Sequence, residues 1–207
     1  MDRISSFSHQ RQLISQALQV QNKVAAKQVE VASGLKSSDY KGVASEARLL
    51  VTLEGELQRA QDYIDNGEVV SARIETMYSA VSQITEIASD ARTWLNEALS
   101  GSNDVTTFNQ QGQAALEELA NLLNTQHGGR YLFGGTVTET APVDLSAYTA
   151  QTSPSAADLS YYVGNSEAAS YAASPDLTVD YGVTGDNSGF EKLLRAMSLA
   201  ANAADDP

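Results

Sequence analysis

Residues able to carry out acid–base or metal chemistry are few in this sequence and are not grouped. His9 and His127 are the only histidines, they lie on separate segments, and there is no cysteine. The acidic pairs Glu117-Glu118 and Asp205-Asp206 would point in different directions on a helix. Phosphate-binding glycine loops, nucleophile elbows, paired metal-binding histidines and calcium loops are also missing. We interpret these residues as surface, capping or solvated groups, and expect no enzyme activity, cofactor or metal.

Aromatic residues offer the remaining candidate chemistry, a site where rings stack on a sugar. Tyr131 and Phe133 alternate in a short segment that looks extended. We favour the alternative that they anchor this segment in a core, because aromatic rings are well suited to strand packing. The same interpretation applies to Tyr161, Tyr162, Tyr171 and Tyr181.

The longest element predicted from the sequence is a stretch of about fifty residues. From Leu49 to Ala98, apolar residues recur in alternating strides of four and three, broken only by Glu56 and Gly67. A 3.5-residue repeat of this length is typical of a helix that packs along a second helix. The Asn66-Gly67 pair could instead mark a turn between two helices. We predict an unbroken helix of roughly 75 Å, because the repeat keeps its phase across the glycine.

A second amphipathic helix is predicted after the loop 100–104, with Phe108 and Ala115 on the same repeat and its end at His127-Gly128-Gly129. A short loop between two long amphipathic helices makes them antiparallel neighbours. The later half of the long helix therefore has a partner within the chain. The predicted core of this helical rod comprises Val70, Ile74, Met77, Val81, Ile84, Ala91, Leu95, Leu119 and Leu122.

Residues 1–33 form a further predicted helix with a broad apolar face and few charge pairs. Such a helix is marginal without a partner, and neither it nor the first half of the long helix has one in the following sequence. Gly34 is the predicted joint, since glycine readily adopts the left-handed conformation that ends a helix. The residues expected to pack between subunits are Leu13, Ala17, Val20, Val24, Val31, Leu49, Leu53 and Ala60.

The remainder of the chain changes character and is rich in Thr, Ser, Ala, Gly, Asp and Tyr. Short strands are predicted at 131–133, 160–163 and 177–183, followed by an amphipathic series from Phe190 to Ala201. The predicted fold is mainly α, a long antiparallel, coiled-coil-like helical rod with a small β-containing lobe. Its expected parts are an assembly helix and joint (1–36), the rod (37–130), the lobe (131–189) and the start of a C-terminal helix (190–207).

The charge of the chain limits its partners. Thirteen basic and twenty-six acidic residues give a net charge of −13, which argues against nucleic acid as a partner. Residues 1–36 carry +3 and residues 136–207 carry −8. This asymmetry indicates either simple solubility or an inner N-terminal part and a water-facing later part. We expect neither a membrane-spanning segment nor a cleaved signal peptide.

Four passages, in this order and spacing, carry a resemblance to a known family. They are Met1–Ser6, Val31–Asp39, Asp65–Gly67 and, most specific, Gly129–Thr136, in which Tyr-Leu-Phe stands between glycine pairs. Together they resemble the bacterial flagellins and their relative, the hook–filament junction protein (hook-associated protein 3). Tyr181–Val183 and Phe190–Leu193 are similar to the end of the family's variable β region. The Arg3-Ile4-Ser5 opening and the Tyr-Leu-Phe passage favour the junction protein over a filament flagellin.

The resemblance implies a secreted structural subunit of the extracellular flagellum that serves motility and is exported through the type III channel. In the family, terminal helices pair into coiled coils that form a tubular inner wall, while the lobe faces outward. The implied partners are further copies, other axial proteins (hook-associated proteins and flagellin) and an export chaperone. Two alternatives remain, namely a filament flagellin and a surface-exposed adhesion module carried by residues 137–189.

The sequence departs from the family in two places. The paired acidic residues after the joint are reduced to Asp39 followed by Tyr40. Family members also continue beyond the β lobe into a long C-terminal helix. We therefore expect either that this is a truncated chain or that another subunit supplies the partner of residues 1–33 and 43–66.

Overall fold

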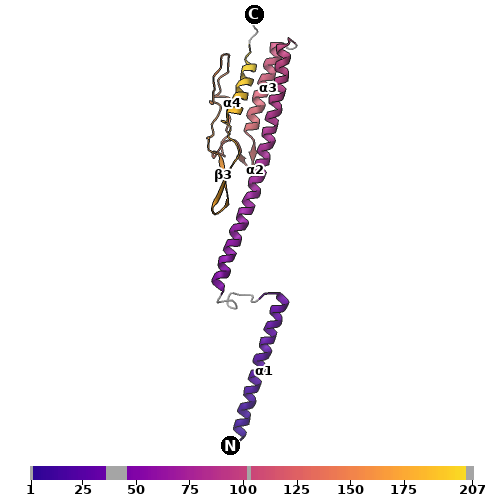
Figure 1. Cartoon of the computed structure of the whole chain (residues 1–207), viewed down its shortest axis with the longest axis vertical. Helices are drawn as coiled ribbons and strands as arrows, with labels where there is room; N and C mark the ends of the chain where they lie inside the picture. The colour runs from indigo at the N-terminus through magenta and orange to yellow at the C-terminus, as the bar shows by residue number, and fades with distance from the viewer. Residues whose placement is uncertain (1, 36–45, 102–103, 204–207) are drawn as a thin grey trace. The chain divides into compact units, whose positions relative to one another are not determined.

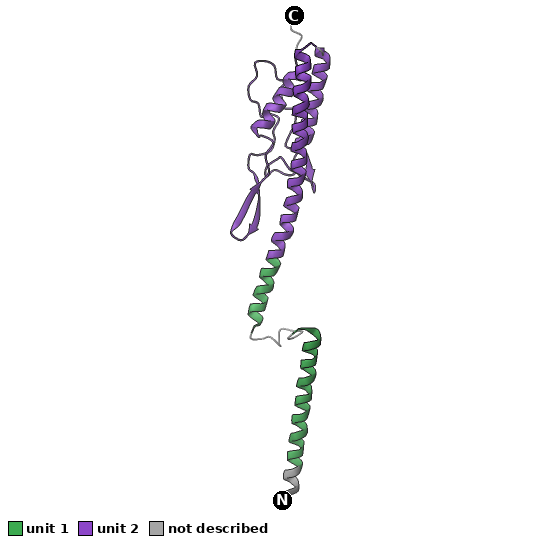
Figure 2. Ribbon diagram, turned by 45° about the vertical axis from the view of Figure 1, so that its right-hand side comes forward, with its two compact units in different colours: residues 1–59 green, residues 60–207 purple. Residues whose placement is uncertain are grey.

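The computed structural model describes residues 2–35, 46–101 and 104–203 of the chain (Figure 1). Most of the predicted joint after Leu35 and the acidic pair Asp205-Asp206 lie outside these residues. The chain divides into two units, residues 1–59 and residues 60–207 (Figure 2). The elements are α1 (Asp2–Ser33), α2 (Ala47–Leu99), α3 (Val105–Leu123), β1 (Gln126–His127), β2 (Arg130–Tyr131), β3 (Ala169–Ser174), β4 (Leu177–Tyr181) and α4 (Ser188–Ala201). The predicted fold class, mainly helical with a small β region, is confirmed.

Helix α2 continues through Gly67 without interruption over 53 residues, so the prediction of a single long helix is confirmed. The glycine serves a packing purpose. A Cβ atom at this position would lie 2.9 Å from the hydroxyl oxygen of Tyr171. That hydroxyl donates a hydrogen bond of 2.5 Å to the backbone carbonyl of Tyr63. Gly67 therefore lets the β3–β4 hairpin approach the backbone of α2.

The core of the unit formed by residues 60–207 lies where α2, α3, α4 and the lobe meet. Helices α2, α3 and α4 lie side by side in both ribbon views (Figures 1 and 2). Val81 and Leu122 pack against the core while partly exposed, and Val70 is also partly buried. The buried members include Met77, Ala80, Ile84, Ala91, Leu116, Leu119, Leu123, Leu194 and Met197.

Three predicted core residues, Val70, Ile74 and Leu95, are not members of this core, and Val70 is only partly buried. The side chains of Ile74 and Leu95 are 43% and 44% exposed, whereas Ala80, which the repeat did not select, is buried. A straight α-helix has 3.6 residues per turn, so a 3.5-residue repeat drifts by about 20° per heptad. Residues at either end of the contact therefore rotate away from the buried face, and Ala80 enters it.

Helices α3 and α4 pack closely in antiparallel orientation. A Cβ atom at Gly112 of α3 would lie 2.8 Å from both the carbonyl carbon and the Cβ of Ala200 in α4. Nearby, the side-chain amide of Asn109 donates a hydrogen bond of 3.1 Å to the carbonyl of Ala203. The glycine therefore sets the short separation of the two helices.

The start of α3 is capped by a side chain, and its end is followed by the β1–β2 hairpin. The carboxylate of Asp104 accepts a hydrogen bond of 2.7 Å from the backbone N–H of Thr107, as an N-cap residue does. The helix ends at Leu123, earlier than the predicted end at His127-Gly128-Gly129. Those glycines instead form the turn between β1 and β2, with φ angles of 58° and 76°. Two consecutive positive φ angles are what a type I′ hairpin turn requires.

The side chain of Asn124 joins the end of α3 to the lobe. Its amide nitrogen donates to the carbonyl of Val143 at 2.8 Å, and its amide oxygen accepts from the N–H of Val143 at 2.9 Å. After Val143 the chain forms a loop whose two ends, near residues 142–144 and 161–163, lie side by side. The N–H of Asp144 donates to the carbonyl of Tyr161, and the N–H of Val163 donates to the carbonyl of Pro142, each at 2.8 Å.

The strands of the lobe match the predictions only in part. The prediction at 177–183 is confirmed by β4, which pairs antiparallel with β3, a strand that the sequence did not indicate. The predicted strand at 160–163 is wrong, because the described structure has only an isolated bridge there between Val143 and Tyr162. Of the strand predicted at 131–133, only Tyr131 lies in a strand, which is β2.

Aromatic rings fill the interior of the lobe, as the sequence predicted for Phe133. This ring is fully buried and meets the ring of Phe190 edge-on, with 5.9 Å between centroids. Tyr161 is also fully buried, against Tyr148 at 5.5 Å, and its hydroxyl donates to the carbonyl of Gly185 at 3.0 Å. These contacts leave Phe133 and Tyr161 no exposed face for stacking on a sugar.

The contact between α3 and α4 gives a first prediction. Replacing Gly112 with Ala should destabilise the 60–207 unit by about 2 kcal/mol, because the added methyl group overlaps backbone atoms of α4. Thermal unfolding followed by circular dichroism at 222 nm would measure the loss. The matched control is Gly55→Ala in α2, where nothing lies within 4 Å of the added atom, so that change should leave or raise stability. Equal unfolding curves for Gly112→Ala and the unsubstituted chain would contradict the close contact.

The tyrosines of the lobe give a second prediction, on alkaline stability. Burial, reinforced by nearby acidic side chains, raises the pKa of Tyr148 and of Tyr162 to about 12 and raises the pKa of Tyr161 further. Because these native pKa values exceed the ordinary value near 10, the stabilisation they report is complete below pH 10. It should be lost progressively as the pH rises from 10 through 12.

Tyrosinate absorbance at 295 nm and circular dichroism, followed in one titration, would test this. We expect these tyrosines to ionise only as the unit unfolds. Tyr148→Phe should make the loss of stability above pH 10 shallower, since one ionisable group has been removed. Ionisation of all the tyrosines near pH 10 with the fold intact would refute the prediction.

Candidate assembly surface

Helix α1 carries a row of apolar side chains that its own unit leaves exposed. The side chains of Val20, Val24 and Val31 are 60%, 51% and 84% exposed, and Leu13 is similarly uncovered. Their spacing of four or seven residues places them on one face of a helix. Groups of exposed apolar side chains of this kind mark surfaces that bind a partner.

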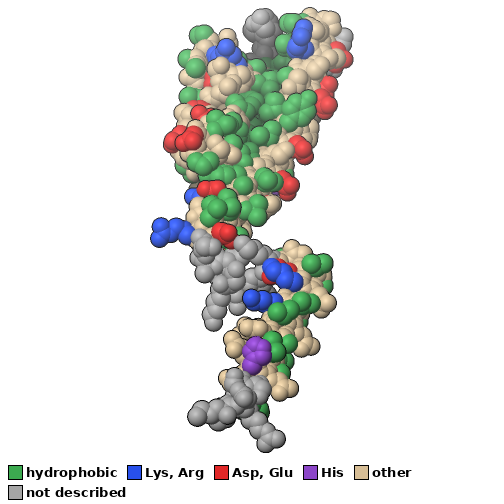
Figure 3. All heavy atoms as spheres, turned by 60° about the horizontal axis from the view of Figure 1, so that its bottom comes forward, with side chains coloured by type: hydrophobic (Ala, Val, Ile, Leu, Met, Phe, Trp, Pro, Cys, Tyr) green, Lys and Arg blue, Asp and Glu red, His purple; other side chains and the backbone are tan. Residues whose placement is uncertain are grey.

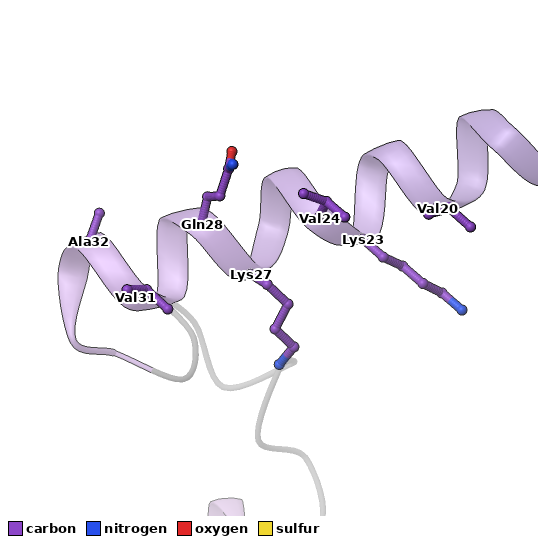
Figure 4. A pocket seen from close by; sticks show the side chains of 7 residues that line it. All are labelled: Val20, Lys23, Val24, Lys27, Gln28, Val31 and Ala32. Atoms are coloured by element: carbon purple, nitrogen blue, oxygen red, sulfur yellow. The ribbon is translucent and has the colours of Figure 1, made fainter.

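The later part of this row borders a shallow hollow of about 510 Å³ (Figure 4). The close-up shows Lys23 and Lys27 projecting together on one side of the helix and Gln28 on the other. The ammonium group of Lys27 pairs with Glu30 at 2.6 Å and stays in solvent. The surface is therefore an apolar row with a basic edge, which suits a partner helix rather than a small polar ligand.

Helix α1 ends as predicted at Gly34, which has a φ angle of 69°. The N–H of this glycine donates to the carbonyl of Glu30 at 2.9 Å, and the hydroxyl of Ser33 donates to the carbonyl of Val29 at 2.7 Å. A left-handed glycine satisfies the last carbonyls of a helix and turns the chain away. Gly34 therefore has the helix-ending conformation that the sequence predicted, and its role as a joint stays a prediction.

The beginning of α2 also exposes apolar side chains. Leu49, Leu53 and Leu57 are 60%, 51% and 71% exposed. Ala17 in α1 and Ala60, just past the unit boundary, are exposed as well. All of the predicted subunit-packing residues thus lie on the surface of the single chain, and their role in packing between subunits stays a prediction.

A second apolar surface lies in the 60–207 unit, and the sequence did not predict it. A groove of about 400 Å³ runs between α2, α3 and α4, lined by residues that include Leu95, Leu193 and Met197. At one end the rings of Trp94 and Phe108 meet edge-on at 5.1 Å. Figure 3 shows hydrophobic side chains gathered over the middle of this unit, with Asp and Glu side chains at its margins. Leu95, expected in the core, lines this groove instead.

The two histidines and the acidic side chains do not form a catalytic or metal-binding cluster among the described residues. His127 is used structurally, because its Nδ1 atom lies 3.1 Å from the hydroxyl of Thr76 and so ties the β1–β2 hairpin to α2. His9 is exposed. Among the residues that the structure describes, no three His, Cys, Asp or Glu side chains form a group that could hold a metal ion. No described helix is both long and apolar enough to span a membrane.

Comparison with known proteins identifies the family. Residues 4–138 match the bacterial flagellin N-terminal helical region, which covers about two thirds of the chain. The match includes nearly all of α1, all of α2 and α3, and the Gly129–Thr136 passage. It therefore includes the exposed apolar row of α1. No curated protein and no solved structure matches the chain. On the strength of this match and of the long helices described above, the chain belongs to the bacterial flagellin family.

Proposed function

We propose that this chain is a structural subunit of the extracellular bacterial flagellum, placed at the junction between hook and filament. Membership of the flagellin family supports the structural role. The Arg3-Ile4-Ser5 opening and the Tyr131-Leu132-Phe133 passage support the junction rather than the bulk filament. The observation that carries the proposal is the uncovered apolar row of α1, because it gives the chain a surface suited to helix packing between subunits.

The proposed mechanism is burial of the apolar rows of neighbouring subunits against one another. Burying a Val or Leu side chain contributes roughly 1.5–3 kcal/mol, so the eight predicted packing residues supply on the order of 10 kcal/mol. Fixing two molecules together costs a similar amount, about 4–15 kcal/mol. A single pair of subunits is therefore marginal, and stable association requires several contacts at once, as in an array.

The proposed partners follow from this mechanism. Further copies and other flagellar axial proteins would cover the apolar rows in the assembly, and an export chaperone would cover them before it. The joint at Gly34 would let α1 change direction relative to the following segment when it packs. These roles rest on the exposed side chains of α1 and on the left-handed glycine that ends it.

A double substitution in the apolar row tests the assembly role. Val20→Asp with Val24→Asp should abolish self-association, because two carboxylates would have to be buried in the contact. Sedimentation velocity across a concentration series would measure association, and Trp94 fluorescence would report the fold of the 60–207 unit. Gln12→Asp with Gln19→Asp, which adds the same charge on the polar face of α1, is the control and should associate normally. Undiminished association of the Val20/Val24 variant would disprove the proposed role of this row.

The location of the subunit distinguishes the junction from the filament. An epitope tag in the lobe, labelled with gold on intact flagella, should mark one short zone between hook and filament if the junction assignment is right. Labelling along the whole filament would instead identify a filament flagellin. A lobe deletion that keeps motility but loses attachment to surfaces would favour the adhesion alternative.

A further inference from the structure

A hollow of mixed character in the 60–207 unit lies between α2 and the β3–β4 hairpin. It has a volume of about 390 Å³, and its lining is polar and apolar in similar measure. The hairpin is held in place by the hydrogen bond from Tyr171 to the backbone of α2 at Tyr63 and by the missing side chain at Gly67. The hollow is therefore part of the folded unit and not an accident of a loose loop.

Two arginines line this hollow, Arg73 from α2 and Arg130 from β2. One Nη atom of Arg73 donates to the hydroxyl of Tyr181 at 3.4 Å, which is a long and weak hydrogen bond. Its Nε atom is buried and has no hydrogen-bond acceptor among the described residues. Within the described part of the chain, neither arginine forms an ion pair with a carboxylate.

The chemistry of the lining selects the group that would bind. A guanidinium presents parallel N–H donors that match the two oxygens of a carboxylate. Arg130, Asn66 and Tyr181 line the same space. The set consists mainly of donors, so it favours an acceptor with negative charge.

The charge of the whole molecule indicates where that carboxylate comes from. Each copy carries a net charge of −13, so copies brought together present an excess of acidic side chains to one another. At physiological salt such repulsion is screened beyond about 8 Å, and only charges in close contact still matter. Two arginines without a carboxylate partner among the described residues, Arg73 and Arg130, offer positive charge at which an acidic side chain of another copy can bind.

We propose that this hollow receives an Asp or Glu side chain from a second copy of the chain. The inference rests on the proposed function, in which copies assemble, and adds a polar, charge-paired contact to the apolar rows. Arg73 and Arg130 bind the carboxylate together, and the hydroxyl of Tyr181 remains a weak further partner of the Arg73 guanidinium. The contact fixes the register of neighbouring copies, because a carboxylate at any other position leaves the arginines unpaired.

Zero-length cross-linking tests the contact directly. In Arg130→Lys, a carbodiimide should couple the introduced amine to the carboxylate held in the hollow. Mixing ¹⁴N- and ¹⁵N-labelled copies lets mass spectrometry tell links between chains from links within one chain. We expect an inter-chain link from position 130 to an Asp or Glu, and a several-fold smaller yield when Arg73→Gln is added. The absence of inter-chain links at this position in associated protein would overturn the inference.

Association measurements separate this inference from the proposed function. Arg73→Gln with Arg130→Gln should weaken self-association at least tenfold. Lys192→Gln, which removes the same kind of charge from an exposed site outside the hollow, should change it less than twofold. Arg130→Gln alone, at an exposed residue, should also weaken association and keeps the test valid if the double variant unfolds. A chain that never associates refutes the proposed function, whereas normal association of the arginine variants refutes only this contact.

Discussion

Helix α2 presents apolar side chains along its whole length. A helix of this kind gains most of its stability where another surface buries those side chains. From Met77 to Ala91 that cover comes from α3, α4 and the lobe, which together bury a continuous core. At Leu49 and Leu53 the same helix is exposed. This uneven cover divides the helix into two parts. The later part folds within the chain, while the earlier part, like α1, leaves its apolar side chains exposed.

Much of the helical architecture could be predicted because it depends on local patterns. The unbroken course of α2 follows from a repeat that keeps its phase, and the end of α1 follows from a glycine that tolerates a positive φ angle. The exact core could not be predicted from that repeat, since Ile74 and Leu95 turn outward and Ala80 turns inward. The close contact at Gly112 was also out of reach, because it depends on α4, which lies far along the chain.

The candidate surfaces divide in the same way. The row containing Val20 and Val24 was predictable, because an amphipathic helix shows its apolar face in its own sequence. The groove beside Trp94 and the hollow at Arg73 are formed by elements that lie far apart in the sequence, such as α2 and α4 or α2 and β4. No local sequence pattern predicts them. From the sequence alone, an arginine that lines a hollow cannot be told from an arginine exposed to solvent. Only the placement of α4 and of the β3–β4 hairpin brings these residues together.

The bridge between Val143 and Tyr162 has a consequence for how the lobe can vary. Backbone hydrogen bonds clamp the two ends of the segment 144–160 beside each other, and Asn124 fastens that clamp to the end of α3. The entropic cost of closing a loop grows only slowly with its length. Extra sequence grafted between Leu145 and Leu159 would therefore leave and re-enter at neighbouring points, so longer decorations are tolerable there while the helices keep their spacing.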